Sequence, residues 1–178
     1  MKAFYFLIPI FMVNACKTQT ETITTTERNT MEQVDNKATG CPEEGTCNVV
    51  LHKNKKLNVK EDGTGAMYPE IVDGQNIVVV YTYMKEGPEG TVDGNYSETI
   101  HFEIPTTEEN ISKENAALND VSILYGKHCF CKGEAGYYPI NNGKLLVEKS
   151  NQALMFDLTF NVGKTSQVVS RITETVKL

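Results

Sequence analysis

Cysteine offers the most chemistry in this sequence, and four cysteines lie in two close pairs, Cys41 with Cys47 and Cys129 with Cys131. With Cys16 they exceed what a cytosolic chain of this size needs, which indicates an oxidising compartment and disulfide bonds. In an extended strand, residues two apart have Cα atoms about 7 Å apart, whereas a disulfide requires about 4.4–6.8 Å. We therefore predict crossed pairing, in which Cys129 and Cys131 each bond to Cys41 or Cys47. Both crossed arrangements stay open.

A metal centre is the alternative chemistry for the same residues. His128, Cys129 and Cys131 would supply one nitrogen and two sulfur ligands, with Cys47 as a fourth. The spacing does not match the Cys-x₂₋₄-Cys pairs of zinc fingers, although copper is compatible with it. Four cysteines outside the cytosol favour disulfides, so we predict no metal and no other cofactor.

Catalytic motifs are absent from the sequence, which has no G-x-S-x-G, no H-E-x-x-H and no Gly-rich phosphate loop. Among the histidines, His52 precedes a basic segment that we predict to be a hairpin tip. His101 is predicted to lie on the exposed outer face of its strand. Carboxylates such as Asp157 or Glu103, on outer faces of predicted strands, carry the remaining enzymatic hypothesis of a carboxylate-dependent hydrolase.

The segment 126–140 (GKHCFCKGEAGYYPI) is the most distinctive part of the chain, because it concentrates cysteine, glycine and tyrosine between two predicted strands. One interpretation is a disulfide-pinned loop that presents Tyr137 and Tyr138 to a partner, since tyrosine combines a large contact area with a polar tip. The alternative is that both rings pack over the edge of the core.

The amino terminus has the pattern of an export signal. Lys2 precedes an apolar run at 3–13, which is shorter than the roughly 20 residues that span a bilayer. A short apolar run that ends in small residues is typical of a secretory signal peptide. We predict that residues 1–15 are this signal.

The end of that signal, Val13-Asn14-Ala15-Cys16, resembles the lipobox of bacterial lipoproteins. The resemblance implies that Cys16 is acylated, becomes the first mature residue and anchors the chain to membrane lipid. It also implies the outer membrane as the destination, because Lys17 follows the cysteine in place of the Asp that resembles a retention signal. The resemblance covers only the targeting segment.

A polar, Thr-rich segment follows the acylated cysteine and completes region 16–40. It lacks aromatic residues and cannot build a core, so we predict a disordered tether with a reach of about 25–30 Å. The chain carries a net charge of −6, which argues against nucleic acid as a partner and predicts that the domain is held away from an anionic membrane surface.

Residues 41–178 show the alternation of strands. Apolar and polar residues alternate over 154–162 and 99–104, one face of 168–178 is largely apolar, and 75–83 is apolar and β-branched enough to be buried on both faces. Shorter predicted strands cover 47–52, 56–60, 121–125 and 144–149. Asp-Gly and Asn-Gly pairs mark turns between them.

These patterns predict an all-β fold and a single domain. The expected architecture is an antiparallel β-sandwich, Ig-like or similar, or a barrel. At most one short helix is expected, within 107–120.

The combined prediction is a membrane-anchored envelope lipoprotein whose β domain binds or scaffolds another component and is not catalytic. Its partner would be an envelope protein or a glycan. The alternative is the carboxylate-dependent hydrolase of the cell envelope.

Overall fold

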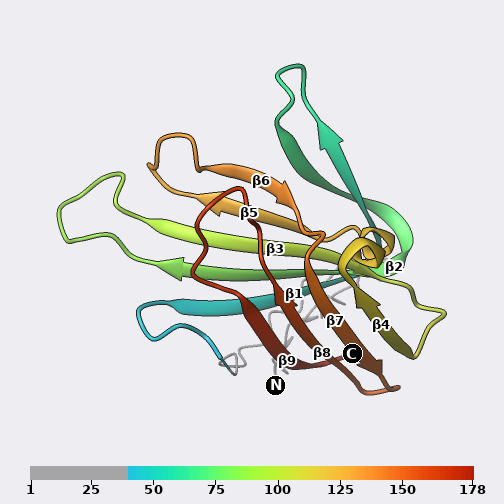
Figure 1. Ribbon diagram of the computed structural model, residues 1–178. Helices are drawn as coiled ribbons and strands as arrows, with labels where there is room; N and C mark the ends of the chain where they lie inside the picture. Colours follow the sequence, from blue (N-terminus) through green and yellow to red (C-terminus); the bar gives the residue numbers. More distant parts are fainter. Residues whose placement is uncertain (1–39) are drawn as a thin grey trace, which may run out of the picture. The chain divides into compact units, whose positions relative to one another are not determined.

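Two antiparallel β-sheets build the domain, as a computed structural model that describes residues 40–178 shows (Figure 1). The five-stranded sheet has the order β1-β2-β3-β5-β6 and the four-stranded sheet the order β4-β7-β8-β9. The strands are β1 (Thr46–Glu61), β2 (Met67–Lys85), β3 (Tyr96–Ile104), β4 (Asn110–Glu114), β5 (Leu124–His128), β6 (Gly136–Pro139), β7 (Gly143–Lys149), β8 (Ala153–Phe160) and β9 (Arg171–Lys177). The predicted all-β, sandwich-like fold is confirmed.

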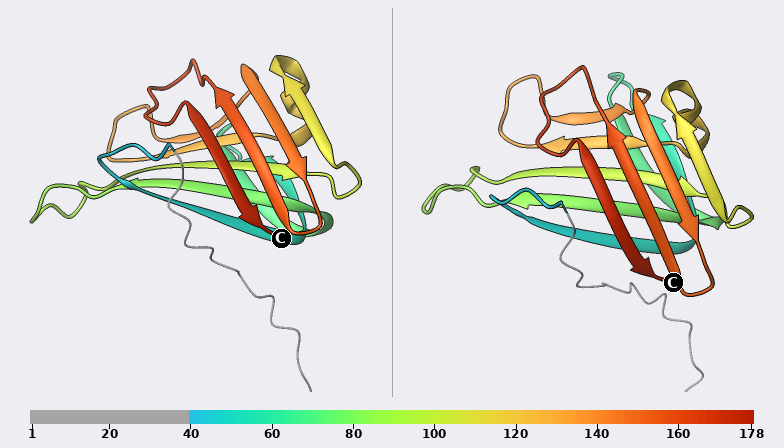
Figure 2. Two further views of the ribbon diagram at one scale, coloured as in Figure 1. Left: turned by 90° about the horizontal axis from the view of Figure 1, so that it is seen from below. Right: turned by 60° about the horizontal axis from the view of Figure 1, so that its bottom comes forward.

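The sheets face each other, and their strands run obliquely across one another (Figure 2). The main core lies between them, and its side chains come from the alternating positions that the sequence pattern identified. Ile100, Phe102 and Ile104 of β3 face Leu154 and Phe156 of β8. Because both inner faces are continuous and apolar, the core explains why the two sheets stay together.

A basic segment predicted as a hairpin tip lies inside β1, so that prediction is wrong. The strand runs through Lys53 and Lys55 with a register shift against β2, and Asn54 has a φ of 56°. An extra residue in one strand bends the ribbon without ending the pairing, and asparagine tolerates this left-handed conformation. The turn instead follows Glu61, where the Asp62 carboxylate accepts backbone hydrogen bonds.

The bend brings the far end of the β1–β2 hairpin over the outer face of the five-stranded sheet. The backbone of Met67 pairs with Tyr137 of β6. Leu57, Val78 and Leu124 are buried there, outside the main core. This second apolar layer also covers part of β3.

Two short strands and the helix differ from the predicted elements. The predicted helix at 107–120 is the strand β4 followed by the 3₁₀ helix η1 (Asn115–Val121), and the predicted strand at 121–125 begins only at Leu124. β4 buries only Ile111 and β6 lies in the Cys/Tyr-rich segment. β6 has no fully buried side chain, and strands with one buried side chain or none carry too little alternation to be recognised.

Candidate functional site

The cysteines pair locally, so the predicted crossed pairing is wrong. Cys41 bonds to Cys47 with a Cα separation of 5.8 Å, and Cys129 bonds to Cys131 with a Cα separation of 5.2 Å. Crossed pairing follows only if Cys129 and Cys131 lie in an extended strand. β5 ends at His128 and the backbone bends immediately afterwards, which brings the two Cα atoms within disulfide range.

The Cys41–Cys47 disulfide fixes the start of β1. A backbone hydrogen bond from Gly45 to Pro42 closes the turn between the two cysteines at 3.2 Å. The Tyr81 hydroxyl donates to the Sγ atom of Cys47 at 2.8 Å. Both cysteines pack against the main core, so this bond belongs to the structural framework.

The second disulfide lies in an exposed loop, residues 129–135, which we call the disulfide loop. Phe130, between the two cysteines, is 90% exposed. The disulfide loop and the β2–β3 loop, residues 86–95, project from the same end of the five-stranded sheet (Figure 1). A hollow of about 340 Å³ lies there, which we call the disulfide hollow, and its lining includes Met84, Asp93, Tyr96, His128, Cys129 and Phe130.

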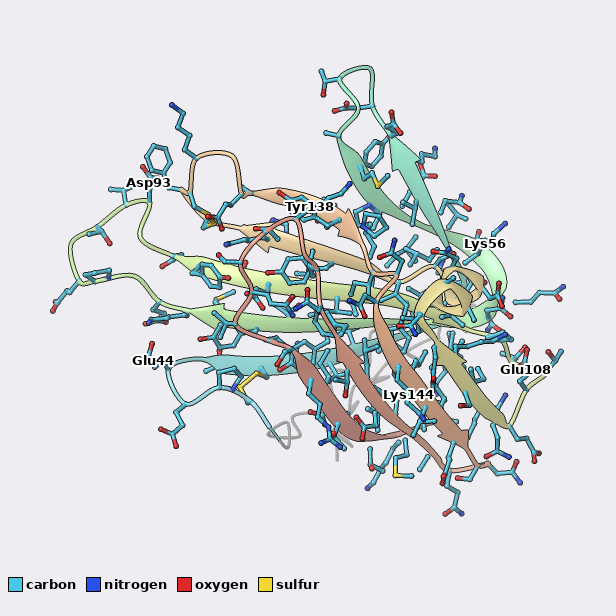
Figure 3. All side chains as sticks on the ribbon, in the orientation of Figure 1. Glu44, Lys56, Asp93, Glu108, Tyr138 and Lys144 are labelled. Atoms are coloured by element: carbon cyan, nitrogen blue, oxygen red, sulfur yellow. A yellow bond between two sulfur atoms is a disulfide. The ribbon has the colours of Figure 1, made fainter. Side chains whose placement is uncertain are left out.

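Exposed apolar side chains lie in and beside this hollow: Met84 and Phe130 line it, and Val92 precedes the lining residue Asp93. Val92 in the β2–β3 loop is 94% exposed, and Met84 at the end of β2 is 46% exposed. Asp93 marks this end of the domain in Figure 3, opposite the end marked by Glu108. Single exposed apolar residues are ordinary on protein surfaces, but a group around a hollow is typical of an interaction site.

The base of the disulfide loop is held by an ion pair whose lysine is buried and whose glutamate is partly exposed. Lys127 on β5 is almost fully buried, contacts the Glu134 carboxylate and donates to Ser166 Oγ at 2.6 Å. Hydrogen bonds from Lys127 and Ser166 lower the pKa of Glu134 to about 2. The Tyr138 hydroxyl donates to the Glu134 carbonyl at 2.9 Å. These contacts fix the loop that carries Phe130.

Tyr137 and Tyr138 lie on β6 and point to opposite faces of the sheet. The Tyr137 ring packs on the outer face, 5.3 Å from the His128 ring and 6.1 Å from the His101 ring. Tyr138 packs toward Tyr125 and is labelled in Figure 3. Both are half-buried, and a role of either in partner binding stays a prediction.

All three histidines lie on the outer face of the five-stranded sheet. His101 is buried rather than exposed, which corrects the sequence-based prediction, because the hairpin beyond the bulge covers it. Burial first, and then the nearby His128 and His52, lower the pKa of His101 to about 4. His128 contacts the Thr99 hydroxyl at 3.2 Å. Within residues 40–178, no three His, Cys, Asp or Glu side chains are arranged to hold a metal ion.

The two carboxylates of the hydrolase hypothesis are not brought together. Glu103 faces outward from β3 and accepts a hydrogen bond from the Leu57 backbone at 2.6 Å, which holds the bent hairpin. Asp157 faces outward from β8, on the other sheet, and forms a bidentate pair with Arg171 at 2.6 and 3.1 Å. Each carboxylate therefore holds a neighbouring segment of the fold, and the two do not form a common site.

Sequence patterns missed a buried carboxylate between the sheets. Glu98 of β3 is fully buried and accepts hydrogen bonds from the backbone of Val168 at 2.6 Å and Val169 at 2.8 Å. The Tyr96 hydroxyl also donates to it. Its position in the strand could have indicated this burial, because Glu98 lies on the same inward face of β3 as Ile100 and Phe102. Glu98 fixes the segment that leads into β9.

Glu174 of β9 is a second inward carboxylate, 5% exposed, and its Oε1 atom has no hydrogen-bond partner. Burial raises its pKa from 4.5 to about 7. The folded protein therefore keeps this proton up to about pH 7, whereas the unfolded chain loses it near pH 4.5. The contribution of Glu174 to stability is complete below pH 4.5 and is lost as the pH rises toward 7.

Replacing Glu174 with Gln is expected to raise the free energy of unfolding at pH 8 by on the order of 2 kcal/mol, with a much smaller effect at pH 4.5. Urea unfolding at both pH values measures this difference. His101 also makes stability depend on pH in this range, with the opposite sign. Its contribution is the same in the native protein and in the variant, so it cancels in the difference between them. Glu148→Gln, at an exposed position of β7, is the control. An equal effect of Glu174→Gln at both pH values would contradict the prediction.

Comparison with known proteins gives no relative: no family model, no curated protein and no solved structure matches this chain. Over residues 40–178, none of the helical segments has the length and apolar character needed to cross a membrane. The predicted signal peptide, the predicted acylation of Cys16 and the predicted tether lie outside the residues that the structure describes, apart from residue 40.

Proposed function

We propose that this protein is a lipid-anchored envelope protein whose β domain binds another envelope protein at the disulfide hollow. The observation that carries the binding function is Phe130. A phenylalanine side chain gains about 1.5–3 kcal/mol from full burial, yet here it is 90% exposed on a loop closed by a disulfide. A partner that covers Phe130 would recover this free energy.

The rigidity of the disulfide loop supports the proposal. The Cys129–Cys131 bond and the partly buried Lys127–Glu134 pair restrict the loop before any partner arrives. Side chains that are already ordered lose less conformational entropy on binding, so a larger share of their contact free energy appears as affinity. Phe130 therefore has the properties of an anchor residue for an interface.

The chemistry of the surface favours a protein over a glycan. Val92, Met84 and Phe130 offer aliphatic and aromatic contact, whereas sugar rings are often held by tryptophan, which this chain lacks. A partner with a small apolar pocket and a polar rim would receive the exposed Phe130 ring at this hollow. Binding to a purified glycan with no protein partner would reverse this choice.

The lipid anchor rests on Val13-Asn14-Ala15-Cys16. Cys16→Ser is expected to abolish labelling by a fatty-acid analogue and to leave the precursor uncut, because serine has no thiol for acylation. Lys17→Ala, one residue away, is the control and should keep its label. Labelling that survives in Cys16→Ser would contradict the anchor.

Phe130→Ser is expected to reduce recovery of the partner from detergent-solubilised envelope at least about tenfold, since interface anchors contribute about 2 kcal/mol or more. Met155→Ser is the matched control, because Met155 is a partly exposed apolar residue on the outer face of the other sheet. Equal recovery with both variants would refute docking at Phe130.

A further inference from the structure

The two disulfides of this domain have contrasting surroundings. Cys47 lies in β1, packs against the core and accepts a hydrogen bond from Tyr81 at 2.8 Å. Cys129 lines the open disulfide hollow, and Phe130 beside it is 90% exposed. Attack on a disulfide requires a thiolate to reach one of the sulfur atoms. The surroundings permit this approach at Cys129.

The spacing of the Cys129–Cys131 pair suits a reversible reaction. Cys129 and Cys131 are only two residues apart, on a loop held by the Lys127–Glu134 pair. After reduction, the two thiols would stay next to each other. Cys131 can then attack a mixed disulfide at Cys129 intramolecularly and restore the Cys129–Cys131 bond, so net oxidation requires a substrate whose second thiolate lies close to the first. All four cysteines are half-buried, and what distinguishes the pairs is that Cys129 lines a hollow whereas Cys41 and Cys47 pack against the core.

We propose that Cys129–Cys131 is a thiol–disulfide exchange centre that oxidises the dithiol of an envelope polypeptide. This activity goes beyond the proposed binding function: it uses the same hollow, but it requires only access to Cys129 and neither the anchor nor a docked partner. Cys41–Cys47 is the structural disulfide of the same domain and takes no part in the exchange.

The reaction balances as a two-electron transfer. A substrate thiolate attacks Sγ of Cys129, the Cys129–Cys131 bond breaks, and Cys131 leaves as a thiolate. The second substrate thiolate attacks the substrate sulfur of this mixed disulfide and releases Cys129. The substrate dithiol is oxidised to a disulfide, the protein disulfide is reduced to two thiols, and these take up the two protons that the substrate loses.

Neighbouring side chains support both proton movements. His128 lines the same hollow as Cys129, and burial lowers its pKa, so its imidazole is neutral at pH 7 and can accept the proton of an attacking thiol. Lys132 follows Cys131 directly and is exposed. Lys132 thus puts a positive charge on the same loop as the leaving cysteine, and a cation close to a cysteine favours its thiolate form.

The first test uses the full-length native protein and reduced glutathione as the probe. Thiols formed over time are trapped by alkylation, and peptide mass mapping assigns them. Cys129 and Cys131 are expected to become alkylated at least about tenfold faster than Cys41 and Cys47. Equal rates, faster reaction of Cys41–Cys47, or alkylation of Cys129 and Cys131 without reductant would overturn the proposal.

The second test measures oxidation of a synthetic peptide with two free cysteines, with one peptide disulfide expected per protein. Replacing Cys129 and Cys131 together with Ser is expected to abolish this oxidation. The double replacement of Cys41 and Cys47 is the matched control and should retain it. Peptide oxidation that is unchanged by loss of Cys129 and Cys131 would overturn the proposal, whatever the outcome of the partner-recovery experiment.

Discussion

Replacing Phe156 with Ala is expected to lower the free energy of unfolding by about 3–5 kcal/mol, which is the usual cost of removing a buried aromatic side chain. Phe156 is fully buried on β8, and its ring meets that of Phe102 on β3 at a centroid distance of 5.2 Å and an interplanar angle of 74°. The pair joins the two sheets. The substitution therefore leaves a cavity at the contact that holds the sandwich together.

Urea unfolding monitored by far-UV circular dichroism measures this loss. Met155→Ala is the matched control, because Met155 is the preceding residue on β8 and is 41% exposed. Its cost is expected to stay near 0.5 kcal/mol. Combining Phe156→Ala with Phe102→Ala should show a coupling of about 0.5–1.5 kcal/mol. A loss in Phe156→Ala no greater than in Met155→Ala would contradict the described packing.

Replacing Glu98 with Ala is the second substitution with a large expected effect, a loss of about 3–4 kcal/mol. The Glu98 carboxylate accepts a buried hydrogen bond from the Val169 backbone and partly buried ones from the Val168 backbone and the Tyr96 hydroxyl. Each buried donor left without a partner costs about 1–3 kcal/mol. Removal of the buried carboxylate itself offsets part of that sum.

Hydrogen exchange measures the loss of stability in Glu98→Ala and also shows where in the domain it arises. In Glu98→Ala, the amides of Val168 and Val169 should lose protection first, because they lose their acceptor. Glu44→Ala, which removes an exposed ion pair with Lys85, is the control and should leave the protection of Val168 and Val169 unchanged. Unchanged protection at Val168 and Val169 would show that Glu98 does not hold this segment.

The main strands could be predicted because alternation records which side chains face the core. The run 154–162 identified β8 in this way, with Leu154, Phe156, Leu158 and Phe160 all buried. β4 escaped prediction because it buries only Ile111. Alternation detects a strand through several buried residues, so a short edge strand leaves no trace in it.

Contacts between distant segments could not be predicted from the same patterns. His101 is buried because a bulge at Asn54 folds the hairpin over β3, and nothing in the sequence around His101 indicates that cover. The disulfides were mispredicted because an extended backbone was assumed for Cys129 and Cys131, where a bend follows β5.

The sequence predicts the segment that contains the candidate site but emphasises different residues within that segment. Composition pointed to 126–140, and the disulfide hollow is partly formed by it. The prediction emphasised Tyr137 and Tyr138, which are half-buried on β6, whereas Phe130 is the exposed aromatic residue. Sequence alone could not separate these roles, because exposure depends on how the loop is held by Lys127 and Glu134.

Site-specific photo-crosslinking in intact cells tests the central claim, docking of a protein at the disulfide hollow, most directly. A benzophenone amino acid placed at position 130 or 92 of the full-length protein is expected to form one and the same protein adduct. The same probe at position 155 or 146, on the outer face of the four-stranded sheet, is expected to form none. Adducts only from positions 155 and 146, or none from position 130, would contradict the account.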